Sequence, residues 1–280
     1  MRVAIVCIAK LENRYIREFV KYHYNLGIDD IFICDNNDVD GEWFEPVLDD
    51  YIENGFVHIY NARGLKSTKD FSVMYVAYNK IYSDINKKFD WIIFIDCDEF
   101  IELNGFSNIK KYLSQDKFNK FDVIHLNWMC YDDNNQIKDN GKPVIIRFVT
   151  PLPLESDINI HVKSIVRGGL NIPSNCLYTD NSHTPMHNNL RYCNNCGEES
   201  PVYPWPKQNF DDAYIKHYFN KTIQEYVNIK MKRGNADVDP VLKPEYAYTI
   251  DKFFLGNKIT QEKLDYLKSI GIEYTPKDKN

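Results

Sequence analysis

Short apolar runs alternate with helix-like segments over the N-terminal third of the chain, and this pattern constrains the fold most. Residues 3–9 ("VAIVCIA") form a continuous apolar run, and further strand-like runs occupy residues 30–34, 56–61 and 91–95. Strands that are apolar along their whole length are typical of sheets covered by helices on both faces. Right-handed crossovers between such strands make neighbouring strands parallel. We therefore predict an α/β fold with a mostly parallel sheet.

Two of the intervening segments have the apolar spacing of helices. In the first, apolar residues recur between Tyr15 and Leu26, after which Gly27 can adopt the left-handed backbone that ends many helices. In the second, apolar residues recur between Phe71 and Ile85. Each segment follows one strand-like run and precedes another, so we predict a series of strand–helix units.

The balance of charges excludes one class of partner. The chain has 280 residues, 44% of them hydrophobic and 14% aromatic, which is enough for an ordered core in one large domain or two small ones. Its net charge of −6 argues against binding nucleic acid through electrostatic attraction. A local basic cluster in the C-terminal third could still bind phosphate, so we expect a small anionic ligand.

Cysteine usage and hydropathy point to a protein of the cytoplasm. Seven cysteines, an odd number at irregular spacing, favour reduced thiols over a disulfide framework. The N-terminal apolar run is too short for a signal peptide, and no window approaches the roughly 20 apolar residues of a transmembrane helix. We therefore expect a cytoplasmic protein without a transmembrane segment.

Acidic side chains directly follow two of the predicted strands. Asp35 and Asn36 follow the second strand, and Asp96 and Asp98 follow the fourth, in the stretch "WIIFIDCDEF". In a parallel α/β sheet the carboxyl ends of the strands form the edge at which ligands bind. Two aspartates two positions apart can both reach a Mg²⁺ or Mn²⁺ ion that bridges the oxygens of a diphosphate. The sequence therefore predicts a site for a metal and a diphosphate.

Structural alternatives remain for these acidic residues. Asp96 could instead cap a turn, with Asp98 and Glu99 solvated, and the Asp35 segment has the composition of an Asx turn. Burying carboxylates beside an apolar strand is costly without a cation or hydrogen bonds, which favours the metal site. Asp35 itself is expected at the surface, where it would contribute little stability. A calcium-binding loop is excluded, because no start at Asp35 or Asn36 provides both the oxygen ligands and the closing glutamate.

Four stretches in order resemble one known family. The segment "DWIIFIDCDEFIEL" resembles the D-x-D region of GT-A glycosyltransferases, in particular bacterial family-2-like and family-92-like enzymes with a D-x-D-E-F signature. "AKLENRYIREFVKYHYNLGIDDIFICDNND" is similar to the K-N-E, Y-H-x-x-L-G and D-N-N blocks of that family, although Leu11 replaces the usual Asn and Asp38 the usual Ser. "HVKSIVRGGL" and "IKHYFNKTIQEYVNIKMKRGNAD" resemble its later K-S-I-V-R and H-Y-x-x-K blocks. The resemblance covers residues 3 to about 238.

The resemblance implies a Rossmann-like GT-A fold and a metal-dependent glycosyltransferase. A UDP-linked nucleotide-sugar donor would bind the half formed by residues 1–104, and a saccharide or glycolipid acceptor the half formed by residues 105–234. Residues 235–280 would form a C-terminal helical extension of the GT-A domain at 1–234. The family further implies an inverting reaction in surface polysaccharide or lipooligosaccharide synthesis, with peripheral association at the inner face of the membrane.

The matching blocks also imply roles for individual residues. Donor-binding residues would be Lys10, Glu12, Asp35, Asn36, Asp96 and Lys221. Of these, Asp35 would accept a hydrogen bond from the nucleotide base. Mn²⁺ or Mg²⁺ would be bound by Asp96, Asp98 and His217, with Asp98 as the more direct ligand and His183 as the alternative to His217. A histidine by itself is more often structural than a ligand, so the role of either histidine depends on the resemblance.

The sequence leaves the catalytic base open. Inverting transfer needs a carboxylate that deprotonates the acceptor hydroxyl. Asp132 and Asp133 follow a strand-like run on the expected acceptor side, and Glu155, Asp157 and Asp180 are further candidates. Each of the five, taken alone, is more readily explained as a solvated loop residue.

Helix signals are strong in the C-terminal third. Thr222 and Glu225 form a capping-box pattern, and basic residues from Lys230 to Arg233 crowd the far end, where the helix dipole favours cations. The helix dipole is a sufficient explanation for these basic residues. Residues 260–270 have helical spacing behind a threonine cap, and we expect this segment to dock on the body or on another subunit.

Other classes of protein share some of these features. A nucleotidyltransferase also combines an α/β sheet with metal-binding carboxylates, but "AKLENRY" lacks the glycine-rich loop typical of that class. A haloacid-dehalogenase-type phosphatase carries its D-x-D after the first strand rather than the fourth. A non-catalytic nucleotide-sugar-binding protein would not need both carboxylates, and metal-dependent hydrolysis of the donor would distinguish it.

A zinc site is an alternative interpretation of the cysteine-rich region. Cys193 and Cys196 have knuckle spacing, and Cys176, His183 and His187 lie upstream. The irregular spacing, the lack of a second C-x-x-C pair and several nearby prolines favour a long loop on the acceptor side instead.

Overall fold

The structure is a computed structural model, and it describes residues 1–173, 176–202, 205, 207–234 and 247–276. Its N-terminal part alternates strands and helices as predicted: β1 (Val3–Ala9), α1 (Ile16–Asn25), β2 (Asp30–Asp35), α2 (Glu45–Glu53), β3 (Val57–Asn61), α3 (Val73–Ile85) and β4 (Trp91–Phe94). There follow β5 (Glu99–Leu103), α4 (Ile109–Leu113), β6 (Val123–Cys130), α5 (Val144–Arg147), β7 (Val162–Arg167), β8 (Tyr192–Cys193) and β9 (Ala213–His217). Further helices are α6 (Ile223–Glu225), α7 (Met231–Arg233), α8 (Ile250–Phe253) and α9 (Gln261–Ser269), with 3-10 turns η1 (Asp116–Phe118) and η2 (Asp157–Ile160) and a π-helical turn η3 (Tyr226–Lys230).

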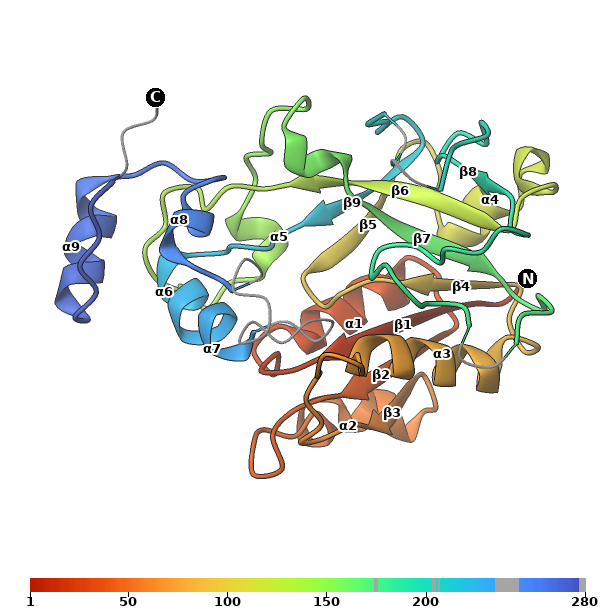
Figure 1. The fold of residues 1–280 in the computed structure, drawn as a ribbon, viewed down its shortest axis with the longest axis horizontal. Coiled ribbons are helices and arrows are strands. Elements are labelled where there is room, and N and C mark those ends of the chain that lie inside the picture. The colour runs from red at the N-terminus through yellow and green to blue at the C-terminus, as the bar shows by residue number, and fades with distance from the viewer. Residues whose placement is uncertain (174–175, 203–204, 206, 235–246, 277–280) are drawn as a thin grey trace.

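The strands form one sheet in the order β3-β2-β1-β4-β7-β6-β9-β5, with β8 beside β6 (Figure 1). Strands β3, β2, β1 and β4 are parallel, whereas β7 runs antiparallel to both β4 and β6. Strand β9 is parallel to β6, and β5 is antiparallel to β9. The predicted α/β fold with a mostly parallel sheet is confirmed, and the antiparallel pairings between its strands all involve β7 or β9.

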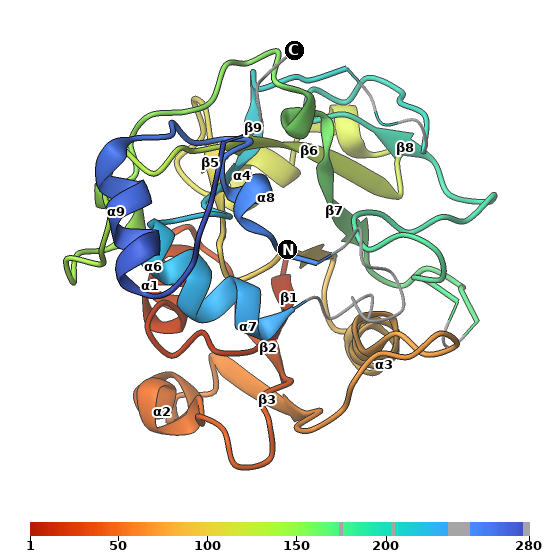
Figure 2. The same cartoon turned by 60° about the vertical axis from the view of Figure 1, so that its left-hand side comes forward.

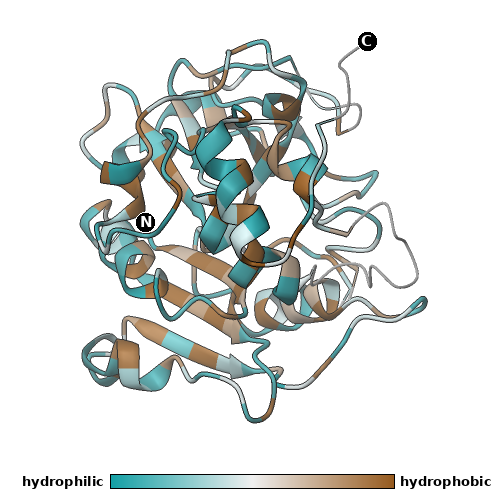
Figure 3. Cartoon of the chain, turned by 90° about the vertical axis from the view of Figure 1, so that its left-hand side faces the viewer, coloured by the Kyte–Doolittle hydropathy of each residue, from teal (hydrophilic) through white to brown (hydrophobic). Residues whose placement is uncertain are grey.

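Both faces of the N-terminal part of the sheet are covered, because successive side chains of β1 point to opposite sides. Ile5 belongs to the same core cluster as Phe19 of α1, whereas Val6 belongs to the cluster that contains Tyr78 of α3. Figure 2 shows α1 and α2 on one side of β1, β2 and β3, and α3 on the other. Hydrophobic colour concentrates on these strands in Figure 3. Burial on both faces explains why the strands are apolar along their whole length.

The C-terminal helices dock on the body, as expected. Phe253 of α8 and Leu267 of α9 pack with Ile223 of α6 in a separate apolar cluster. Lys263 of α9 also forms a buried ion pair with Asp133 in the loop after β6. The boundary expected for this extension lies outside the described residues, and the division of the preceding domain into two halves stays a prediction. None of the described helices is long and apolar enough to cross a membrane.

Candidate functional site

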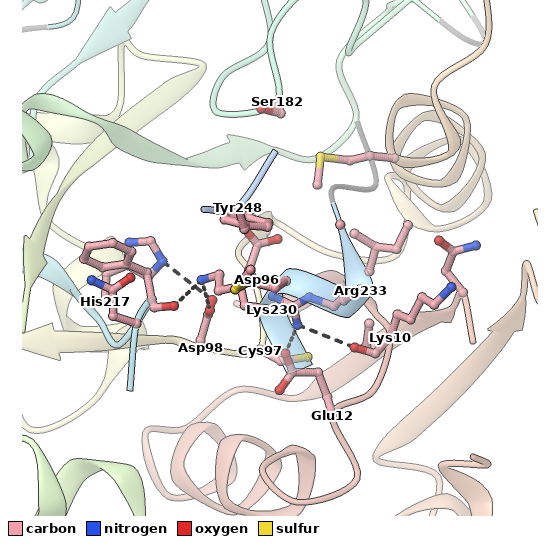
Figure 4. A pocket seen from close by; sticks show the side chains of 18 of the residues that line it. Lys10, Glu12, Asp96, Cys97, Asp98, Ser182, His217, Lys230, Arg233 and Tyr248 are labelled. Carbon is pink, nitrogen blue, oxygen red and sulfur yellow. Dashed lines mark hydrogen bonds and ion pairs between the residues drawn. The ribbon is translucent and has the colours of Figure 1, made fainter. Parts of the chain in front are cut away.

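A cavity of about 820 Å³ opens at the carboxyl ends of β1 and β4 (Figure 4). Its described lining includes six lysines and one arginine but only four carboxylates, although the chain as a whole carries a net charge of −6. The cavity brings together seven of the predicted site residues: Lys10, Glu12, Asn36, Asp96, Asp98, His183 and His217. A basic cavity beside a pair of carboxylates suits a strongly anionic ligand.

Asp98 lies in the turn between β4 and β5, where it is buried and surrounded by nitrogen atoms. Its carboxylate oxygens lie 3.0 Å from Nζ of Lys230, 3.6 Å from Nε2 of His217 and 3.9 Å from Nζ of Lys221. Burial would raise the pKa of Asp98, but these three groups outweigh burial and hold that pKa well below its usual range. Burial lowers the pKa of His217 to about 4, against the opposing effect of Asp98. Asp98 is therefore an anion at neutral pH, and Lys230 is its nearest counter-ion.

Asp96 pairs with a different lysine. Lys163 of β7 is buried, and its Nζ lies 2.7 Å from Oδ2 of Asp96, whose side chain is 31% exposed. Glu99 supports this pair, because its Oε2 accepts a hydrogen bond of 2.9 Å from the backbone N of Asp96 and lies 3.7 Å from Nζ of Lys163. Burial raises the pKa of Glu99 well above its usual range, and Lys163 offsets this only in part. Glu99 thus holds the turn that presents both aspartates.

Lys230, the nearest counter-ion of Asp98, lies at the end of η3 in the continuous run of α6, η3 and α7. The predicted capping box is present, since Thr222 accepts a hydrogen bond from the backbone N of Glu225 and Glu225 accepts one from the backbone N of Thr222. Glu225 also accepts hydrogen bonds of 2.7 and 2.9 Å from buried Arg147 and one of 2.7 Å from the hydroxyl of Tyr15. This buried network fixes the start of the run whose later turns carry Lys230 into the cavity.

Lys221 lies beside the main cavity, in a small neighbouring pocket. Its backbone has a φ of 55°, a left-handed conformation that side chains other than Gly and Asn rarely adopt. Its Nζ lies 4.4 Å from the centroid of the Tyr15 ring and 3.9 Å from Asp98. Strain of this kind persists where the surrounding structure enforces it, and it is frequent at functional sites.

The edge of the cavity near β1 and β2 combines polar and apolar side chains. Nζ of Lys10 lies 2.8 Å from Asp38, and Arg233 of α7 forms an ion pair with buried Glu12. The side-chain nitrogen of Asn36 donates to two backbone carbonyls, which leaves its side-chain oxygen unused by those bonds. Ile8, Leu65 and Met74 are among the apolar side chains that line the cavity. This edge therefore offers both hydrogen bonds and apolar surface to a ligand.

The expectation that Asp35 lies at the surface is wrong. Its side chain is 1% exposed, and its Oδ2 lies 2.6 Å from a guanidinium nitrogen of Arg63, which is also buried. Its Oδ1 accepts hydrogen bonds from the backbone and side-chain nitrogens of Asn37, at 2.9 and 2.8 Å. This is the Asx turn that the sequence left open. Because Arg63 holds the carboxylate in the interior, Asp35 is not among the described residues that line the cavity.

Comparison with known families assigns the chain. Its sequence matches glycosyltransferase family 92 over residues 2–231. The chain belongs to this family. No curated protein gives a significant match to the sequence.

Solved structures show weaker likeness to this family 92 glycosyltransferase. Residues 1–349 of TarS from S. aureus align with a TM-score of 0.38 and 12% identity, over 60% of this chain and 47% of that one. The same fragment in complex with UDP-GlcNAc gives a TM-score of 0.36 and 13% identity, over 60% and 45% of the two chains. Mannose-6-phosphate isomerase from Helicobacter pylori gives 0.31 and 14%, over 50% and 52%. The glycosyltransferase chain thus spans about half the length of each of these, and its assignment rests on the family match.

The D-x-D residues of this glycosyltransferase have the donor atoms of a divalent-cation site, but they do not complete one. Carboxylate oxygens suit Mg²⁺ and Mn²⁺, and imidazole nitrogen is a common metal ligand. One oxygen of Asp96 already pairs with Lys163, and one of Asp98 pairs with Lys230. No three described His, Cys, Asp or Glu side chains surround a common metal position. A cation here therefore needs further oxygens from a bound ligand, as Mg²⁺ in phosphate-binding sites does.

The cysteine-rich region of the glycosyltransferase shows no zinc cluster among the described residues either. Cys193 is buried in β8, and Sγ of Cys196 lies 3.8 Å from the side-chain oxygen of Asn209. His183 lines the large cavity. The zinc interpretation thus gains no support from the geometry.

The carboxylates expected as the catalytic base lie away from the cavity of the glycosyltransferase. Asp133 is buried in its ion pair with Lys263, and Asp132 accepts a hydrogen bond from Asn134 in its own loop. The remaining three candidates are exposed and are not part of the described lining: Glu155, Asp157 and Asp180. Within the described lining, Glu12 and Asp38 are the carboxylates other than the D-x-D pair, and both are paired with cations.

Sequence reasoning missed three cations that shape this site. Lys163 had no assigned role, although a lysine inside the apolar run "VKSIV" signals a buried ammonium group that needs a carboxylate. The helix dipole was a sufficient explanation for Lys230 and Arg233, which in the structure pair with Asp98 and Glu12. No local signal marks these two contacts, because the direction in which a helix presents its last turn depends on how the helix packs.

Proposed function

We propose that this family 92 glycosyltransferase transfers a sugar from a UDP-linked donor to a saccharide or glycolipid acceptor, with inversion. The basic cavity around the D-x-D pair supports the donor most directly, because it places seven cationic side chains against four carboxylates. A nucleotide sugar carries its negative charge on the diphosphate, and its base needs a mixed polar and apolar site. We further propose, as the sequence resemblance implies, that the reaction belongs to surface polysaccharide or lipooligosaccharide synthesis in the cytoplasm, at the inner face of the membrane.

In this proposal the diphosphate lies over Asp96 and Asp98 and shares their lysines. An ammonium group has three donors, so Lys163 and Lys230 can each contact an aspartate and a phosphate oxygen at once. The aspartates hold the two lysines in position before the donor arrives. As the bond between sugar and diphosphate breaks, negative charge grows on the leaving oxygen. Ammonium groups that are already in position stabilise that charge without reorganising.

We propose that Mn²⁺ or Mg²⁺ binds together with the donor. Asp96 and Asp98 would hold the cation, with His217 as the nearest imidazole and His183 as the alternative. When bound, the cation would act as a Lewis acid that neutralises the departing diphosphate. Until then Lys230 and Lys163 balance the charge of the two carboxylates.

Nucleotide binding tests the donor site. UDP should raise the melting temperature of the wild-type protein, and more so with Mn²⁺ than with EDTA, because cation and diphosphate share one site. Uridine, which lacks the diphosphate, is the control and should give a much smaller shift. No shift with UDP would refute the nucleotide site, whereas equal shifts with Mn²⁺ and EDTA would refute only the metal.

A panel of UDP-sugars tests the reaction itself. The protein with Mn²⁺ should release UDP slowly from the correct donor, because water can replace the acceptor. Asp180→Asn, which changes an exposed carboxylate outside the cavity, should match the wild type. Binding of UDP without any turnover would indicate a non-catalytic nucleotide-sugar-binding protein. Release of pyrophosphate from UTP with a sugar phosphate would indicate a nucleotidyltransferase.

A further inference from the structure

Two neighbouring leucines at the mouth of the cavity are exposed to solvent. Leu255, in the turn after α8, is 80% exposed and lines the cavity, and Leu154, in the loop before η2, is 55% exposed. Leu152 connects the two, because a Cβ atom added to Gly256 would lie 3.3 Å from Cδ1 of Leu152. We call Leu152, Leu154 and Leu255 the apolar rim. Exposed apolar side chains that lie together mark an interaction surface, whereas isolated ones need no explanation.

The exposure of both leucines is built into the backbone. Leu154 follows Pro153, whose carbonyl oxygen accepts a hydrogen bond of 3.0 Å from the side chain of buried Asn159. Buried Asn257 holds the turn of Leu255 in the same way. Its side chain accepts a hydrogen bond of 2.7 Å from a backbone nitrogen of the loop after β6 and donates one of 2.8 Å to a carbonyl oxygen of α8. Because both turns are fixed, the two leucines stay exposed unless another molecule covers them.

Electrostatic attraction does not determine what covers the apolar rim. The exposed charged residues of the described turns 149–157 and 255–259 are Glu155, Asp157 and Lys258, and Lys252 lines the cavity nearby. These charges cancel, and the chain as a whole carries a net charge of −6. A molecule that covers the rim is therefore held by apolar contact.

The composition and shape of the rim favour a lipid bilayer over a protein partner. Protein interfaces are enriched in aromatic side chains and arginine, and the exposed residues of the described turns 149–157 and 255–259 include neither. Leu154 is exposed outside the cavity lining and Leu255 at its edge, so the two form a projecting surface. Such a surface suits insertion between the lipids of a bilayer, whereas a single lipid chain needs a groove that encloses it.

The position of the rim connects such a bilayer to the cavity. Leu255 and Ile158 both line the cavity, so a bilayer in contact with the rim lies at the cavity mouth. The sugar of a membrane glycolipid then reaches the D-x-D pair while its lipid chains stay in the bilayer. We propose that the apolar rim docks the enzyme on a phospholipid bilayer by inserting Leu154 and Leu255 between the lipids. This inference rests on the proposed function, because it takes the acceptor to be a glycolipid.

Flotation with phospholipid vesicles tests the docking surface. The wild type should bind vesicles of phosphatidylcholine, with and without phosphatidylglycerol, and high salt should change this little because the contact is apolar. Leu154→Ser should weaken vesicle binding about threefold, and the double variant Leu154→Ser/Leu255→Ser about tenfold or more. Val76→Ser, at a residue of α3 that is 45% exposed, is the matched control and should bind as the wild type does.

Three results would overturn the docking surface. The first is a wild type that does not bind vesicles, or a double variant that binds them equally well. The second is binding that requires phosphatidylglycerol and is lost at high salt, since this would assign the contact to charge. The third is a wild-type dimer, seen by sedimentation, that dissociates in the double variant, since this would assign the rim to a second copy of the chain.

Folding and the proposed function are checked separately. Leu154 lies outside the described cavity lining, so Leu154→Ser should keep the UDP-induced rise in melting temperature. If the double variant does not fold, the vesicle binding of Leu154→Ser alone decides. Failure of the proposed function would appear as loss of UDP binding in the wild type, which flotation without nucleotide does not measure.

Discussion

Two acidic segments lie at the same edge of the sheet, one after β2 and one after β4, yet their carboxylates pair with different cations. The segment after β2 contains Asp35, which is buried against Arg63 and turned back on its own backbone. The segment after β4 contains Asp96 and Asp98, which line the cavity and pair with lysines that line it as well. Both segments satisfy the rule that ligands bind at the carboxyl ends of strands. Their position on the sheet therefore does not distinguish them.

The counter-ion distinguishes them. Arg63 is fixed by further hydrogen bonds to backbone carbonyls of residues 38–42, and its guanidinium lies 3.8 Å from the ring centroid of Trp43. Such a cation cannot leave Asp35 without breaking several contacts. Lys230 is also buried and also donates to the carbonyl of Phe219, but it lines the cavity together with Asp98, so a ligand there can contact both. A carboxylate at a strand end is thus available to a ligand when the carboxylate and its counter-ion line the same cavity.

The largest expected effect is on catalysis, at Asp98. Asp98→Asn keeps the shape of the side chain but removes the charge that pairs with Lys230 and that would bind the proposed divalent cation. Release of UDP from the correct donor should fall about a thousandfold, because electrostatic stabilisation of the leaving diphosphate is lost. Activity, Mn²⁺ affinity and melting temperature should be measured on one preparation, with Asp180→Asn as the control. A folded variant with near-normal, Mn²⁺-stimulated turnover would remove the distinction between the two segments.

The matching substitution at the other segment should act on stability. Asp35→Asn leaves the buried guanidinium of Arg63 without its anion, so the free energy of unfolding should fall by roughly 3 kcal/mol. Urea denaturation measures this fall, and UDP affinity of the folded variant should stay close to that of the wild type. A stable variant with greatly weakened UDP binding would instead indicate that Asp35 contacts the nucleotide base of UDP, as the family resemblance implies.

A smaller effect is expected when the counter-ion of Asp98 is removed. Lys230→Met keeps the length of the side chain but loses the ammonium group, so UDP should bind about tenfold more weakly in the presence of EDTA. Titration calorimetry with UDP measures the change, and Lys87→Met at an exposed position is the matched control. Unchanged UDP affinity would show that Lys230 pairs only with Asp98 and does not contact UDP, just as Arg63 pairs with Asp35.

The smallest effect concerns the loop after β1, the strand that lies between β2 and β4 in the sheet. Leu11 has a φ of 55°, and its backbone N donates a hydrogen bond of 2.8 Å to the side chain of Asn37. Asn tolerates a left-handed backbone better than Leu, which accounts for the Asn that resembling sequences have here. Leu11→Asn should raise the free energy of unfolding by about 1 kcal/mol, measured by urea denaturation. Leu11→Ala, which keeps a Cβ without the amide, should not be stabilised, and equal gains for both would point to another cause.

The sequence predicted the parts of this molecule whose causes are local. Helix α1 ends at Asn25, and Gly27 two residues later has the left-handed φ of 92° that the sequence predicted for its end. The capping box at Thr222 forms from residues three apart. The D-x-D turn follows the most apolar strand, and its cost of burial already indicated a cation. Such features depend on neighbours in the chain, so one sequence is sufficient to find them.

The parts that could not be predicted depend on residues that meet only in the folded chain. Arg63 lies 28 positions after Asp35, and no feature of either segment predicts that the two form an ion pair. Lys230 lies 132 positions after Asp98, at the end of a π-helical turn that shifts the direction of the following residues. The position of Asp133 likewise depends on Lys263, which is why a candidate for the catalytic base is instead a structural anchor. Charge pattern indicated which residues were ionised but not which pairs they would form.

The ion pair between Asp133 and Lys263 has a consequence for the order of events during synthesis. A chain emerges from the ribosome N-terminus first, so its N-terminal parts can fold before the rest has been synthesised. The strands that end in the D-x-D segment emerge early, but Lys252 and Leu255, which line the cavity, belong to the segment that α9 ties to the body. A nascent chain therefore has its acidic pair in place long before that wall of the cavity exists, and the site as described is complete only after α8 and α9 have docked.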